Sequence, residues 1–461
     1  MKKIDFSIVL YNDHTNRLTF FTGLDFLWLI LWVILVLVIA NYIRVRNKNK
    51  EHYKFFMLNL YFKLAFSLIF CLYFIFFIRG GDTIAYFDTS RVLTNLLFKH
   101  PEYYFAEWPA FMDQVDYVGH FSQETGFPPK WIAREEEGYF VSKIFSLLNI
   151  FTGSSYLANN VITAFLMSLA SFRLYDFFVS FGLHDTKKLA IYFLFIPSIA
   201  FWCSGFSKDV IAITCLYYMI PTAYNFITIK KERKIWNIFL ILLLSIILFK
   251  IRPFMLLVIF IPFLFLINFL FLKTYFKSKF TQRIIWLLFV FISLGIMQNY
   301  LTRGTGQKYL NEIKITQTDF KNNQIYTGAK YDIGDFNSTL SGLLKATPIS
   351  LVSGIYRPLL WEALSPGLIL NGIESVILIY LTAIFFMKKR SLKIERIQRS
   401  GILIFSFYFV MLFAYVAGYT SVIFGLLVRI RAPLLPIFIA LITVKPEVGK
   451  IEEKAATEVT I

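Results

Sequence analysis

Long apolar runs separated by short basic segments are the main pattern of this sequence. A helix needs about 20 mostly apolar residues to cross the hydrocarbon core of a bilayer, and most of the runs are close to that length. The pattern predicts an all-α fold: a polytopic transmembrane helical bundle of about 11 transmembrane helices. The expected spans lie near residues 24–43, 55–78, 156–181, 189–203, 210–229, 235–249, 254–272, 284–297, 367–386, 402–417 and 434–444.

Two long polar intervals interrupt the apolar pattern. The first loop contains two segments with apolar residues at helical spacing, 88–99 and 139–151, which we expect to lie flat in the membrane interface. The second loop is rich in Gly, Asn and Thr and suggests a cover. We therefore expect residues 1–461 to form a single membrane domain. Its parts are the first two helices (24–78), the first loop (79–154), the central helices (155–298), the second loop with a juxtamembrane segment (299–366), the last helices (367–445) and a tail (446–461).

Basic residues show which side of the membrane each loop occupies. The alternate short segments 44–54, 184–188, 230–234, 273–283 and 388–399 are all rich in Lys and Arg. Cytoplasmic loops have this excess of positive charge. The pattern predicts a multi-pass protein of the cell (inner) membrane, with the N-terminus outside and the C-terminus cytoplasmic. Both long loops, and any chemistry that takes place on them, are then extracytoplasmic.

Composition excludes other classes of protein. Hydrophobic residues make up 57% of the chain and charged residues 16%, which a soluble domain could not bury. The formal charge of +18 comes from the short loops rather than from one soluble basic face, so a nucleic-acid partner is not expected. The three cysteines and five histidines lack metal-ligand spacing, so no metal site built on them is predicted.

Charged residues at the outer ends of the helices are the candidates for chemistry. An Arg-Gly-Gly-Asp stretch at 79–82 follows the second span, and Tyr86 and Asp88 lie shortly after it. The two glycines allow a sharp turn that would direct Asp82 inward at the membrane surface. There a carboxylate can act as a general base toward a sugar hydroxyl. The alternative is that Asp82 caps a helix and pairs with Arg79.

A second group starts the helix after the turn at 204–207. Ser207 suits the N-cap and Asp209 suits the positive helix end, so a structural role explains both. Lys208 is a cation at an unfavourable position, which a bound anion would explain.

Further outer cations are Lys250, Arg252, Arg357 (with Glu362 nearby), Arg429 and Arg431. Taken singly, each could reach up to lipid phosphates. Taken together with Arg79 and Lys208, they suit a lipid-linked phosphate or diphosphate, because guanidinium groups bind phosphate oxygens in pairs.

At these residues the chain resembles the polytopic glycosyltransferases of the GT-C type, which use polyprenyl-phosphate donors. The similarity involves the Gly81-Asp82 motif with Tyr86, the long first loop, and the stretch 195–209. By this resemblance Asp82 would activate the acceptor, with Asp88 as second choice, and Lys208, Arg252 and Arg357 would hold the donor phosphate. Asp209 and Glu362 would support the site.

A second resemblance is to Wzy-like polysaccharide polymerases, which join glycan repeat units. It involves Gly425, Arg429, Arg431, Pro433 and Pro436. Both resemblances imply a polyprenyl-linked sugar donor, a glycan or lipid-linked acceptor and membrane lipids as partners. A flippase or transporter of glycolipids is the alternative of another class. No cofactor is predicted, although Asp82, Asp88 and Glu362 could supply oxygens to a divalent cation.

Overall fold

The structure is a computed structural model that describes residues 20–106, 119–229, 232, 234–276, 278–302, 305–323, 329–334, 339–363, 365–387 and 390–445. The predictions for the N-terminal end and for the tail 446–461 lie outside the described residues. Within those ranges every regular element is a helix, apart from one antiparallel bridge between Lys330 and Ile423. The all-α prediction is confirmed.

Eight helices in the described part of the chain are long and apolar enough to cross a membrane, so the protein is a multi-pass membrane protein. They agree with eight of the expected spans, although the last one starts at Phe424 rather than near residue 434. The eight are Gly23–Arg46, Glu51–Ile78, Tyr156–Ser180, Lys208–Thr228, Pro253–Tyr275, Gly367–Met387, Gly401–Thr420 and Phe424–Ile442.

Of the three other expected spans, one is wrong. The continuous span at 189–203 is interrupted: α10 (Thr186–Leu194) ends before α11 (Pro197–Trp202), because proline has no N–H to continue the helix. The other two are helical as expected, in α13 (Ile235–Ile251) and α15 (Lys279–Thr302), and their crossing of the membrane stays a prediction.

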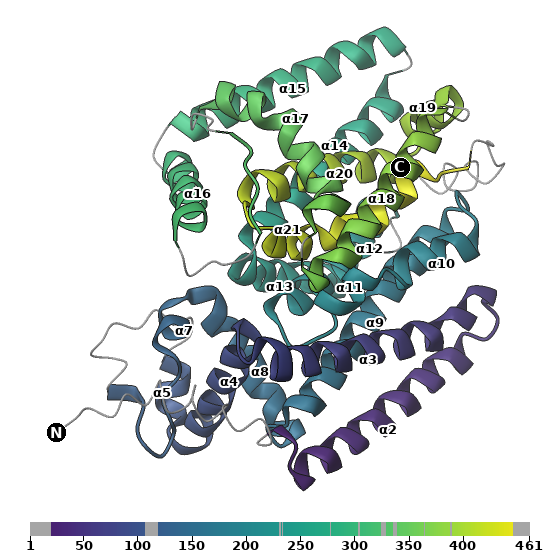
Figure 1. Ribbon diagram of the computed structural model, residues 1–461. Coiled ribbons are helices and arrows are strands. Elements are labelled where there is room, and N and C mark those ends of the chain that lie inside the picture. Colours follow the sequence, from purple (N-terminus) through teal and green to yellow (C-terminus); the bar gives the residue numbers. More distant parts are fainter. Residues whose placement is uncertain are drawn as a thin grey trace. The chain divides into compact units, whose positions relative to one another are not determined.

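The chain divides into two compact units, where the sequence suggested a single domain. The first unit comprises residues 1–180, 193–223 and 232–253, and the second comprises 181–192, 224–231 and 254–461. In the first unit, α2 (Gly23–Arg46) and α3 (Lys54–Leu72) both pack along α9 (Tyr156–Ser180) (Figure 1). A 3-10 turn (η3, Glu51–Tyr53) precedes α3, and a π-helical turn (η4, Tyr73–Ile78) extends it.

The first loop folds into four described helices: α4 (Asp82–Lys99), α5 (Pro101–Ala106), α7 (Lys130–Arg134) and α8 (Glu136–Thr152). Both segments expected to be helical are helical, but α4 begins six residues before residue 88. Consequently Asp88 lies inside α4 and is buried, not at its cap. Asn149 of α8 donates to Ser90 Oγ (2.9 Å) and Thr94 Oγ1 (3.3 Å) of α4. A shared core, and not the membrane surface alone, therefore holds these helices.

The second unit is built from α14 (Pro253–Tyr275), α15, α16 (Thr305–Asn322), α17 (Leu340–Tyr356), η6 (Leu360–Glu362), α18 (Pro366–Met387), α19 (Arg390–Arg399), α20 (Gly401–Thr420), α21 (Phe424–Arg431), η7 (Ala432–Leu434) and α22 (Leu435–Ile442). Two glycines let α17 and α20 approach closely. A Cβ on Gly418 would lie 2.0 Å from the Ser350 carbonyl oxygen, and one on Gly354 would lie 2.0 Å from that of Ala414. Only glycine fits at these two positions.

The end of the second loop is attached to the start of α21. The Tyr331 N–H donates to the Val422 carbonyl (2.9 Å), and the Phe424 N–H donates to that of Ala329 (3.0 Å). The Tyr331 ring stacks on Phe424, with 5.0 Å between ring centroids. This part of the expected cover is therefore joined to the helices beneath it.

We predict that Gly418→Ala lowers the melting temperature of the purified protein by several degrees, because the added methyl group forces α17 and α20 apart. Overpacking of this kind costs about 1–3 kcal/mol. Gly425→Ala is the matched control, since a Cβ at Gly425 has no heavy atom within 4 Å. Equal melting temperatures for the two variants would contradict the close packing.

Candidate functional site

The turn at residues 203–207, which leads into α12 (Lys208–Thr228), is fixed by hydrogen bonds from two other helices. Thr163 of α9 donates to the Ser204 carbonyl (2.9 Å), and Asn160 Oδ1 accepts the Phe206 N–H (2.8 Å). Thr83, in the first turn of α4, donates to the Phe206 carbonyl. The start of the first loop and the start of α12 are therefore held together.

Side-chain packing also fixes the conformation of this turn. The Phe206 ring stacks on Phe145 of α8 with 3.6 Å between centroids. A Cβ on Gly205 would lie 2.0 Å from the buried Phe70 ring, so glycine is required. Ser207 accepts the Val210 N–H (3.3 Å), which confirms it as the N-cap of α12.

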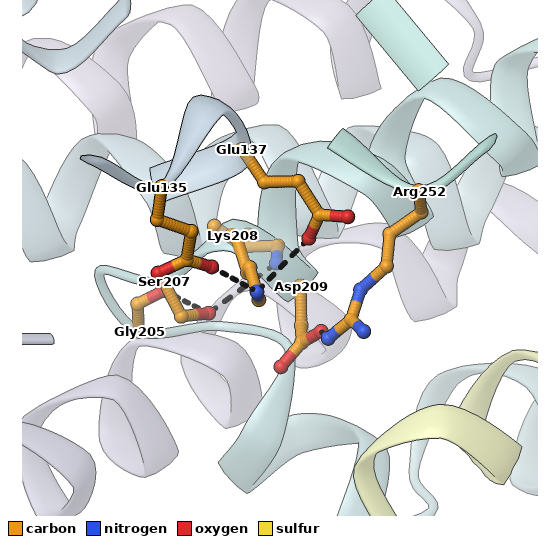
Figure 2. Close-up of polar contacts among 8 residues, drawn as sticks. Glu135, Glu137, Gly205, Ser207, Lys208, Asp209 and Arg252 are labelled. Carbon is orange, nitrogen blue, oxygen red and sulfur yellow. Dashed lines mark hydrogen bonds and ion pairs between the residues drawn. The ribbon is translucent and has the colours of Figure 1, made fainter. Parts of the chain in front are cut away.

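Lys208, the first residue of α12, has two carboxylate partners. Its Nζ lies 3.1 Å from Glu135 Oε1 and 3.1 Å from Glu137 Oε2, as Figure 2 shows. Glu135 occupies the N-cap position of α8 and Glu137 its first turn, where the helix dipole favours negative charge. These two carboxylates compensate the unfavourable position of Lys208. That position alone therefore does not indicate a bound phosphate.

The end of α13 supplies two more cations to the same region. Lys250 pairs with Glu136, the residue between the two partners of Lys208. Arg252 Nη2 lies 2.7 Å from Asp209 Oδ1, and the two side chains are only 9% and 2% exposed (Figure 2). Arg252 Nε is buried without a hydrogen-bond partner. Three separate chain segments thus meet in a group of ion pairs, which we call the charged cluster: Glu135, Glu136, Glu137, Lys208, Asp209, Lys250 and Arg252.

The first-loop motif borders this charged cluster. A Cβ on Gly138 would lie 2.9 Å from Tyr86 Cε1 and 3.1 Å from Glu135 Oε2, so the Tyr86 ring and the Glu135 carboxylate flank the same glycine. Arg79 has left-handed backbone geometry (φ 59°), and Gly80 and Gly81 also have positive φ, which produces the expected sharp turn. Asp82 follows as the first residue of α4 and is exposed.

The remaining site residues lie in the second unit. Arg357 Nε is 3.2 Å from Glu362 Oε1, and its guanidinium lies 5.2 Å from the centroid of the Tyr331 ring. Burial raises the pKa of Tyr331, so its hydroxyl stays protonated and donates to the Gly418 carbonyl (3.3 Å).

The position of Arg431 differs from the predicted one. It lies inside the span Phe424–Ile442, not ahead of the last span, and it is fully buried. Its guanidinium donates to the Ile355 carbonyl (3.0 Å) and to Ser375 Oγ (3.3 Å), and Glu374 interacts with it electrostatically. These partners allow an arginine inside a membrane span. Arg429, two residues earlier in the sequence, is half-buried.

Sequence reasoning found the cations of the charged cluster but missed the carboxylates Glu135, Glu136 and Glu137. Three consecutive acids directly before an amphipathic segment are a recognisable signal, because helix N-termini favour acids. What the sequence could not show is that they pair with residues more than 70 positions away.

Across the residues that the structure describes, no group of three or more His, Cys, Asp or Glu side chains is arranged to hold a metal ion. Comparison with protein-family models, with curated proteins and with solved structures found no match to the chain. The residues themselves are therefore the basis for a functional proposal. In the charged cluster the four carboxylates outnumber the three cations by one, so the cluster has a formal excess of negative charge.

We predict that Arg252→Leu destabilises the protein strongly, since it leaves the buried Asp209 carboxylate without its partner. Breaking a buried ion pair costs about 3–5 kcal/mol. The double variant Arg252→Leu/Asp209→Leu should recover much of the melting temperature. Lys99→Leu, which removes an exposed partner of Glu124, should change stability by no more than about 1 kcal/mol. A double variant no more stable than Arg252→Leu would contradict this account.

Proposed function

We propose that the protein is a membrane enzyme that transfers a glycosyl group from a polyprenyl-phosphate or polyprenyl-diphosphate donor. The reaction would take place on the extracytoplasmic face of the cell (inner) membrane, in the assembly of a cell-envelope polysaccharide or glycan. The N-terminus would lie outside and the C-terminus in the cytoplasm. The observation that supports this proposal most is the charged cluster at helix ends beside the first-loop motif.

In this reaction Asp82 removes the proton from an acceptor hydroxyl. The acceptor oxygen forms a bond to the anomeric carbon of the donor sugar as the bond from that carbon to the phosphate oxygen breaks, which inverts the configuration. The electron pair leaves with the polyprenyl phosphate, and nearby cations stabilise its charge. Exposure of Asp82 at the start of α4 supports this role, since a base must reach the acceptor.

Binding of the donor would rearrange the charged cluster. Lys208 already has two carboxylate partners at 3.1 Å, so a donor phosphate has to replace at least one of them. The displaced carboxylate then no longer has Lys208 as its partner.

Transport of a glycolipid or an anionic solute is the second candidate function. One observation favours it: Lys63, within the span Glu51–Ile78, is fully buried and donates to the Leu194 carbonyl (3.2 Å). Leu194 is the last residue of α10, at the break before α11. Broken helices with buried charges are typical of transporters.

Asp82→Asn is predicted to abolish glycosyl transfer, because the amide cannot accept the proton. Proteoliposomes supplied with a polyprenyl-diphosphate-linked saccharide would be assayed for glycan product by mass spectrometry. Glu124→Gln, an exposed first-loop carboxylate, is the matched control and should retain activity. Normal product from Asp82→Asn would remove Asp82 from the mechanism. Movement of intact donor across the bilayer without product would instead favour the transporter.

Lys208→Ala is predicted to raise the KM for the donor and lower kcat, since the variant loses a cation that would contact the phosphate. Charge-assisted hydrogen bonds are worth about 1.5–3 kcal/mol, or roughly 10- to 150-fold in kcat/KM. Unchanged kinetics in this variant would remove Lys208 from the site.

The glycan profile of a strain that lacks this protein distinguishes a polymerase from a single-sugar transferase. Loss of long chains, with accumulation of single repeat units, would identify a Wzy-like polymerase. Loss of one sugar from the glycan would identify a single-sugar transferase. An unchanged glycan profile would contradict both.

A further inference from the structure

The second unit contains an apolar cavity of about 600 Å³ between α14, α15, α17, α18, α19, α20 and α22. Aromatic and aliphatic side chains form most of its wall, among them Phe265, Phe385, Phe407, Tyr408 and Met411. Its volume lies in the range of about 300–1,000 Å³ that is usual for pockets holding a small ligand. In a membrane protein, such a lining fits a hydrocarbon chain.

Apolar side chains outnumber polar ones in the cavity wall. The Tyr356 hydroxyl donates to Thr382 Oγ1 at 3.0 Å, so these two hydroxyl groups are paired. Beside this pair a ligand needs no hydrogen-bonding group. A plain hydrocarbon segment fits this part better than a sugar or a peptide does.

Two arginines lie next to residues of the cavity wall where α17 ends, although neither is itself part of the lining. Ile355 and Tyr356 line the wall, the Ile355 carbonyl accepts a hydrogen bond from Arg431, and Arg357 is the next residue after Tyr356. Arg357 Nη1 and Arg431 Nε are both buried without a hydrogen-bond partner. A buried unsatisfied donor costs about 1–3 kcal/mol, and each of these belongs to a guanidinium group, which fits phosphate oxygens. Arg431 is fully buried, so bulk water does not compensate for the missing partner.

We propose that the second unit binds a single-chain lipid phosphate, with the chain in the apolar cavity and the phosphate against Arg357 and Arg431. A cavity of this size accommodates a segment of one chain, which favours a polyprenyl phosphate over a diacyl phospholipid. The identity of the chain as a prenyl chain rests on the proposed function. The location of the site rests on the cavity and the two arginines alone.

The test measures binding of undecaprenyl phosphate to the purified full-length protein by native mass spectrometry. Met411→Trp fills the cavity, and Arg357→Gln removes a cation that is only half-buried. Each should raise the dissociation constant by about tenfold or more. Leu257→Trp on the exposed face of α14 and Arg399→Gln on the exposed face of α19 are the matched controls, and should stay within about twofold of the parent protein.

Phosphatidic acid has the same phosphate head group on two acyl chains, and undecaprenol has the chain without the phosphate. Both should bind more weakly than undecaprenyl phosphate. Equal binding of phosphatidic acid, or unchanged binding in both site variants with normal melting temperatures, would overturn the proposal.

Glycosyl transfer measured on the same preparations separates this site from the proposed function. Specific binding that the site variants weaken, in a protein without transfer activity, would support the lipid site and contradict the enzyme. Transfer activity with unchanged dissociation constants in both site variants would support the enzyme and contradict the lipid site.

Discussion

A charged side chain between apolar helices must have a partner of opposite charge or a carbonyl group within reach. Unpaired charges cost several kcal/mol or more when they are removed from water. In the first unit this requirement helps to determine which helix ends meet: Asp209 lies in the first turn of α12, Arg252 caps the end of α13, and their contact makes both burials tolerable. In the second unit Arg431 finds the Ile355 carbonyl and Ser375 instead.

The same requirement explains why the charged cluster combines the first loop with the membrane helices. Lys208 and Lys250 come from helices in the membrane-spanning region, and their partners Glu135, Glu136 and Glu137 come from the start of α8. The loop is therefore attached by charge as well as by packing on α4. In the proposed reaction, a site at this junction would bind both a membrane-embedded donor and a water-soluble acceptor.

Hydropathy was sufficient to predict most of the fold. Eight spans, the helical segments of the first loop and the N-cap at Ser207 follow from apolar runs and local capping rules. The errors have local causes. Pro197 breaks a run that is apolar throughout, and Arg431 resembles a span boundary because its partners in α17 and α18 are distant in sequence.

Distance in sequence also explains why only part of the candidate site could be predicted. Cations on the side that the charge pattern predicts to be outside stand out against the charge bias of membrane proteins, so Lys208, Lys250 and Arg252 could be predicted. The pairing of these cations with their carboxylate partners could not be predicted, because the partners are distant in sequence and meet only in the fold.

Glu135, Glu136 and Glu137 are neighbours in sequence but form ion pairs with two different lysines. This arrangement limits where the first loop can change in length. Each residue of a helix is turned by about 100° from the one before. Removing or inserting one residue between Glu137 and the buried face of α8 would rotate all three acids past their lysines. Lineages of this protein should therefore tolerate insertions and deletions before α7 far more readily than within the first turn of α8.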